Sequence, residues 1–153
     1  KNDAVMFIKS HYHHEINKNY VVNKSLSNII YLTPGDVPDI NNILPFVDVL
    51  ISDYSGVLLD YLILDKPIIP TSFDLEEYTN SDRELYEDYD KTVMGINCNN
   101  WCEVQIQLQD IFSGNDLSVP CRKEMSTRFF KFSDTNNCER IIESVTNHLK
   151  TQV

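Results

Sequence analysis

A short segment near the middle of the chain places small polar residues between an apolar run and a helical pattern. Residues 49–51 are apolar, as in a central strand of a parallel sheet, and residues 55–64 recur at helical spacing. Ser55 stands where a helix N-cap is expected, with Gly56 beside it. Helix N-termini and the carboxyl ends of parallel strands both favour phosphate, so this elbow predicts a phosphate site. The alternative is that Ser55 only caps the helix.

Three further side chains of the elbow could contact a ligand. Ser52 ends the strand, where it could equally bond the backbone. Asp53 could contact an acceptor or orient the loop; a carboxylate would repel a bound pyrophosphate, which favours a structural hydrogen bond. Asp60, inside the helix, could accept hydrogen bonds from ribose hydroxyls, pair with Lys66 or cap another segment.

Histidines and one arginine elsewhere could also do chemistry. His11 and His13 would share one side of an extended segment, but the cluster lacks a carboxylate at metal-ligand spacing, so no metal site is predicted. His11 could accept a proton or, when charged, stabilise a phosphate; otherwise it is a polar loop residue. Arg83 could bind a phosphate oxygen or form a surface ion pair.

Composition narrows the class of protein. The chain has 153 residues and 42% hydrophobic content, enough for one domain with a core. It carries 13 Lys plus Arg against 23 Asp plus Glu, a net charge of −10, which disfavours nucleic acid and non-specific binding to an anionic membrane. No run approaches the roughly 18 apolar residues of a membrane span. The cysteines lack zinc-knuckle spacing and are expected to be reduced thiols: Cys98, Cys102, Cys121 and Cys138.

Strand and helix patterns alternate through the first half of the chain. Strands are expected at residues 4–9, 28–32, 49–52 and 67–71. Helices are expected at residues 13–18, 40–46 with Asp39 as N-cap, 55–64, 100–112, 120–130 and 136–150, with a short helix or irregular arm over 75–89. The last helix has one apolar stripe: Ile141, Ile142, Val145 and Leu149. The alternation predicts an α/β fold, a single Rossmann-like domain over residues 1–153 whose doubly wound parallel sheet has helices on both faces.

Several segments, taken in order, resemble the CDP-glycerol glycerophosphotransferases, which build teichoic acids and related capsular polymers. Residues 48–56 (Asp-Val-Leu-Ile-Ser-Asp-Tyr-Ser-Gly) are similar to the family's D-V-L-I-T-D-Y-S-S. Its F-D-Y and L-x-K-P-I-I elements are matched by residues 59–61 and 64–69. Residues 74–78 and 83–89 are similar to D-x-x-x-Y and R-G-x-Y-x-D-Y, with Glu84 replacing the glycine. His11 with Tyr12 is similar to the family's histidine element, and residues 132–135 match its Y-D-G faintly, with Thr135 replacing the glycine.

The resemblance implies a function and a partner domain. It implies transfer of glycerol phosphate, or a related polyol phosphate, from a CDP-activated donor such as CDP-glycerol to a growing cell-envelope polymer. The chain would resemble the C-terminal, nucleotide-holding domain of a GT-B enzyme, facing a missing N-terminal domain. His11 would be catalytic, and no cofactor or metal is implied. The donor would be bound by Ser52, Asp53, Tyr54, Ser55, Gly56, Asp60 and Arg83.

The resemblance leaves location and two other functions to be considered. The chain alone is expected to be inactive, and the full enzyme to be cytoplasmic, reaching the inner face of the membrane only through parts outside this chain. One alternative is a GT-B-type sugar transferase or epimerase that uses a UDP-sugar. The other is a non-catalytic nucleotide-binding or interaction module. A pocket that reads cytosine would favour transfer from a CDP-activated donor. Loss of ligand binding would favour the non-catalytic module.

Overall fold

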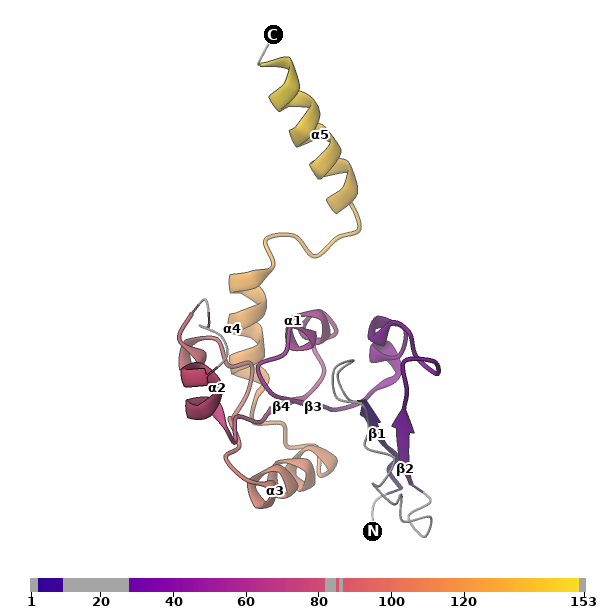
Figure 1. The fold of residues 1–153 in the computed structure, drawn as a ribbon, viewed down its shortest axis with the longest axis vertical. Helices are drawn as coiled ribbons and strands as arrows, with labels where there is room; N and C mark the ends of the chain where they lie inside the picture. The colour runs from indigo at the N-terminus through magenta and orange to yellow at the C-terminus, as the bar shows by residue number, and fades with distance from the viewer. Residues whose placement is uncertain (1–2, 10–27, 82–84, 86, 152–153) are drawn as a thin grey trace.

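The computed structural model describes residues 3–9, 28–81, 85 and 87–151. His11 and Arg83 lie outside these residues, and so does the helix expected at 13–18. The fold is α/β with parallel strands, and the strands expected from the sequence are confirmed within a residue or two of their ends (Figure 1).

The strands form two parallel pairs. β1 (Met6–Lys9) pairs with β2 (Ile29–Leu32), and β3 (Leu50–Ser52) pairs with β4 (Ile68–Pro70). The pairs are separate two-stranded sheets among the described residues, where the sequence predicted one continuous sheet. Past β4, Thr71 forms one further parallel bridge, to Cys98.

The helix expected at residues 40–46 is instead two 3₁₀ helices, η1 (Ile40–Asn42) and η2 (Leu44–Phe46). Pro45 has no N–H to donate, so it cannot extend an α-helical ladder. The Ile43 N–H instead donates to the Ile40 carbonyl over 3.0 Å, the spacing of a 3₁₀ turn. Asp39 is the N-cap as predicted: its side chain accepts from the Asn41 N–H over 2.9 Å.

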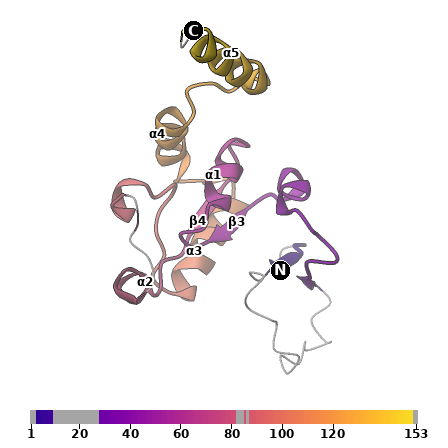
Figure 2. The same cartoon turned by 45° about the horizontal axis from the view of Figure 1, so that its top comes forward.

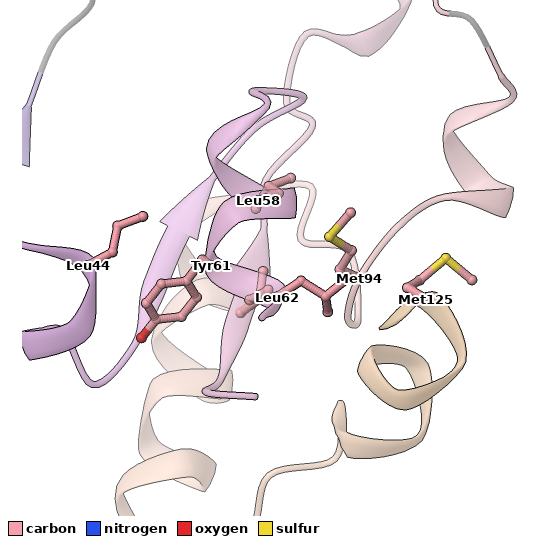
Figure 3. Packing of buried hydrophobic residues seen from close by; sticks show 7 residues of the cluster. Leu44, Leu58, Tyr61, Leu62, Met94 and Met125 are labelled. Atoms are coloured by element: carbon pink, nitrogen blue, oxygen red, sulfur yellow. The ribbon is translucent and has the colours of Figure 1, made fainter. Parts of the chain in front are cut away.

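Helix α1 (Val57–Leu62) crosses from β3 to β4 and is shorter at both ends than the expected 55–64. Its apolar side contributes Leu58, Tyr61 and Leu62 to the main core, which Figure 3 shows from close by. The buried Tyr61 hydroxyl donates to the Val47 carbonyl over 2.8 Å, and burial raises its pKa. The helix is therefore fixed to the segment that leads into β3.

Strand β4 is covered on both faces, as a doubly wound sheet requires. Ile68 belongs to the cluster formed with α1 and with Met125 of helix α4 (Val119–Phe129). Its neighbour Ile69 belongs to a second cluster with Cys98 and with Val104 of helix α3 (Trp101–Phe112). Successive strand residues point to opposite faces, so α1 and α4 lie on one side and α3 on the other.

The C-terminal helices follow the sequence pattern closely. The expected arm begins with helix α2 (Leu75–Ser81), and the 3₁₀ helix η3 (Tyr89–Lys91) starts at its last residue. Helix α5 (Asn137–Lys150) extends away from the other elements in both views (Figures 1 and 2). Its predicted apolar stripe is exposed, with Ile142 at 66%. Within the described ranges, none of the helices combines the length and hydropathy of a membrane span.

Candidate functional site

The elbow between β3 and α1 is held by backbone bonds to the next strand and by its own aspartate. The Thr71 N–H donates to the Ser52 carbonyl over 2.8 Å, which ties the end of β3 to the end of β4. The Asp53 carboxylate accepts from the Ser55 N–H over 3.1 Å, an Asx turn. This is the structural hydrogen bond that the sequence favoured for Asp53.

The N-cap predicted at Ser55 is wrong by one residue. Gly56 occupies the N-cap position of α1, with φ −58° and ψ −18°, and no side chain caps the helix. Ser55 lies in the preceding turn because Asp53 takes its N–H, while its carbonyl accepts from Leu58 over 3.1 Å. Its side chain is exposed, and the described part of the chain offers its hydroxyl no hydrogen-bond partner. That hydroxyl is therefore available to a ligand.

Gly56 faces open space. A Cβ built on this residue would meet no atom within 4 Å. Its backbone is in the ordinary right-handed helical region, so the fold itself does not need a glycine here. The absence of a side chain instead leaves room for a ligand to approach the backbone.

Asp60 lies exposed on the same helix as Gly56. The ion pair with Lys66 that the sequence left open does not form. The Lys66 ammonium donates instead to the carbonyls of Pro45, over 2.7 Å, and Val47, over 2.9 Å. The Asp60 carboxylate is therefore not held by Lys66, and the ribose role proposed for it stays a prediction.

An aromatic cluster joins the elbow to the segments that follow β4. The Tyr54 hydroxyl donates to the Asp74 carboxylate, which precedes α2. The Tyr54 ring stacks on that of Tyr78, with centroids 4.2 Å apart and planes at 25°. Tyr89 meets the same ring edge-on, with centroids 5.8 Å apart at 73°. Three segments that resemble one family in sequence thus meet around one side chain.

Asp74, Tyr78 and Tyr89 belong to the segments that resemble the family, but the sequence pattern predicts no role for them. The signal was present in the D-x-x-x-Y and Y-x-D-Y spacings. It could not be interpreted, because the residues that these side chains contact lie 20 or more positions away in the chain.

Burial raises the pKa of two hydroxyls in the cluster, those of Tyr54 and Tyr89. It raises the pKa of Tyr54, and the hydrogen bond to Asp74 raises it further. Burial also raises the pKa of Tyr89 to about 12, with a smaller contribution from the charge of Asp53. Both tyrosines therefore keep their protons near pH 7. The four cysteines are free thiols, and the described residues contain no group that could hold a metal ion.

Comparisons with known proteins show which sequences and structures the chain resembles. The chain is 28% identical over 145 residues to the teichoic acid ribitol-phosphate polymerase TarL of Staphylococcus aureus, covering 95% of the chain and 24% of the relative. It is 27% identical over 147 residues to the teichoic acid glycerol-phosphate primase of Bacillus subtilis, covering 96% of the chain and 36% of the relative. The chain thus spans about a quarter to a third of these relatives' length.

Solved structures show the same fold. The wall teichoic acid polymerase TagF superposes with a TM-score of 0.71 at 20% identity, covering 97% of this chain and 35% of TagF. A TagF variant soaked with CDPG gives a TM-score of 0.70 at 21% identity, covering 97% and 36%. The Rossmann-like, GT-B-type α/β class expected from the sequence is confirmed. Residues 1–147 match the model of one family, described as CDP-Glycerol:Poly(glycerophosphate) glycerophosphotransferase. Because this match extends over nearly its whole length, the chain belongs to the CDP-glycerol:poly(glycerophosphate) glycerophosphotransferase family.

Proposed function

We propose that this chain supplies the CDP-donor site of an enzyme that transfers a polyol phosphate to a growing cell-envelope polymer. The observation that carries the proposal is the meeting of three family segments at the carboxyl ends of β3 and β4, around Tyr54. Ligands of open α/β sheets bind at that edge. The named relatives act on ribitol phosphate and glycerol phosphate, and the TagF variant was soaked with CDPG.

The reaction we propose is displacement at the donor's β-phosphorus. The acceptor hydroxyl oxygen forms the new P–O bond, the bridging P–O bond of the pyrophosphate breaks, and CMP leaves. The acceptor's proton passes to a general base, a role we give to His11. Catalysis then rests on positioning and on stabilising charge.

The elbow would bind the donor's pyrophosphate. The exposed Ser55 hydroxyl is assigned to a phosphate oxygen, together with backbone N–H groups beside the open space at Gly56. Arg83 would add a charged contact to a phosphate oxygen. Asp60 would accept hydrogen bonds from the ribose hydroxyls, and Ser52 with Asp53 would shape the loop.

The rest of the enzyme would provide the opposite wall of the site. A second, N-terminal domain of the same polypeptide would face the elbow and help to hold the acceptor. The enzyme would work in the cytoplasm, at the inner face of the membrane through parts outside this chain. We therefore expect the chain alone to bind the donor without turning it over.

Titration calorimetry of the chain with CDP, UDP, ADP, CMP and CDP-glycerol tests the donor assignment. CDP is expected to bind more tightly than UDP or ADP. Equal affinities for the three diphosphates would rule out the CDP assignment. Tighter binding of UDP would favour a sugar transferase or epimerase. Binding of none of the nucleotides would favour a non-catalytic module. Turnover of CDP-glycerol by the chain alone would show that no second domain is needed.

A further inference from the structure

Tyr54 connects the ends of two neighbouring strands. It belongs to the loop that follows β3, while Asp74 and Tyr78 follow β4. Its one O–H donor is used by the Asp74 carboxylate. Its ring is stacked on Tyr78 and meets Tyr89 edge-on. The hydroxyl and the ring are thus both engaged by protein groups from residues 74–89.

The loop that carries Tyr54 is held from two sides. From within, Asp53 accepts the Ser55 N–H over 3.1 Å. From outside, the hydrogen bond between Tyr54 and Asp74 ties the loop to the residue that directly precedes α2. Ser55 and Gly56, which we assign to the pyrophosphate, are the next two residues along the chain, so their placement depends on these restraints.

We propose that Tyr54 is a positioning residue of the donor site, which acts through Asp74 to fix residues 53–56 and does not itself contact the nucleotide. This inference rests on the proposed function for its effect on CDP binding. It also assigns Asp74 a place in the site, although neither residue is expected to touch the reacting atoms.

A double-mutant cycle on CDP affinity tests the proposal, at a temperature at which every variant is folded. Tyr54→Phe keeps the ring and loses the hydroxyl, and Asp74→Ala loses the acceptor. Each is expected to weaken CDP binding about tenfold, the effect of losing a hydrogen bond to a charged group. Because both remove the same bond, the double variant should be no weaker than the weaker single variant. Asp74→Asn keeps an acceptor oxygen and should lose less than Asp74→Ala.

Tyr31→Phe on β2 is the matched control, since it makes the same chemical change in the other strand pair and should bind CDP like wild type. Multiplied losses, about 100-fold in the double variant, would show that Tyr54 meets the nucleotide independently of Asp74. Wild-type affinity in Tyr54→Phe would also overturn the proposal.

Hydrogen exchange separates this inference from the CDP assignment, because it needs no nucleotide. The Ser55 amide should exchange about tenfold faster in Tyr54→Phe and Asp74→Ala than in wild type or Tyr31→Phe. If wild type shows no preference for CDP but exchange rises as expected, the donor assignment fails and the positioning role stands. Unchanged exchange in both variants would refute the positioning role, whatever the nucleotide result.

Discussion

Gly56 is the residue at which ligand binding and stability should separate most clearly. A Cβ added there meets no protein atom within 4 Å, and φ −58° with ψ −18° suits any residue. Gly56→Ala gains about 0.4–1 kcal/mol from the less flexible unfolded chain, offset by the weaker preference for alanine at an N-cap. We therefore expect the free energy of unfolding to change by less than about 0.5 kcal/mol, and Tm by about 2 °C or less.

CDP binding should respond differently, because the added atoms enter the space assigned to the pyrophosphate. Crowding a packed contact costs about 1–3 kcal/mol, or about 5- to 150-fold in Kd. Gly56→Val, with its branched side chain, should lie at the upper end of this range and Gly56→Ala at the lower. Titration calorimetry gives the Kd and thermal unfolding the Tm of the same samples.

Two other glycines are controls for this experiment. A Cβ on Gly95 would lie 2.8 Å from the Ile68 carbonyl oxygen and 3.0 Å from Pro70 Cδ, so Gly95→Ala should cost about 1–3 kcal/mol of stability. A Cβ on Gly35 would meet only Thr33 Oγ1, at 3.6 Å, so Gly35→Ala should alter neither quantity. If Gly56→Val unfolds and binds CDP like wild type, no ligand occupies the space beside Gly56 and the elbow assignment is refuted.

The remaining predictions concern a hydroxyl, a buried ion pair and a histidine. Ser55→Ala should change stability by less than about 0.5 kcal/mol yet weaken CDP binding about fivefold to tenfold; a clear drop in Tm would restore the helix-cap role. The buried Arg122 guanidinium lies 2.6 Å from the Asp116 carboxylate, measured from Nη1 to Oδ2. Arg122→Met leaves that carboxylate without its partner, so the free energy of unfolding in urea should fall by about 3–5 kcal/mol; a fall of less than about 1 kcal/mol would contradict this. In the full-length enzyme, His11→Ala should lower turnover about 100-fold or more with CDP affinity nearly intact, whereas near-normal turnover would make His11 a polar loop residue.

The order of elements could be predicted because it depends on local periodicity. The strand at β4 and the helix at α3 were found within a residue or two of their ends. The failures also have local causes, which single side chains decide. Pro45 turned one expected helix into two 3₁₀ helices, and the Asx turn of Asp53 moved the start of α1 past Ser55.

The candidate site was only half predictable. The elbow is a run of neighbouring residues, so strand and helix patterns located it. The tyrosines that contact Tyr54 follow β4 in the sequence. Periodicity does not show which of two distant tyrosines will stack on each other. Helix α5 illustrates the same limit of sequence prediction. The spacing of its apolar residues shows which side of the helix is apolar, but it does not show what covers Ile142.

If a chain of net charge −10 is to bind a diphosphate, as we propose, its carboxylates must be kept from repelling the ligand. The structure shows how two of them are occupied: Asp53 accepts the Ser55 N–H, and Asp74 accepts the Tyr54 hydroxyl. The groups that the described elbow offers a phosphate are neutral donors, the Ser55 hydroxyl and nearby backbone N–H groups. Positive charge for the reaction is therefore assigned, in our proposal, to Arg83 and the facing domain. In our proposal the elbow would hold the pyrophosphate, Arg83 would add one charge, and the facing domain would supply the remaining charge that the transition state needs, so the chain alone should bind the donor without transferring it.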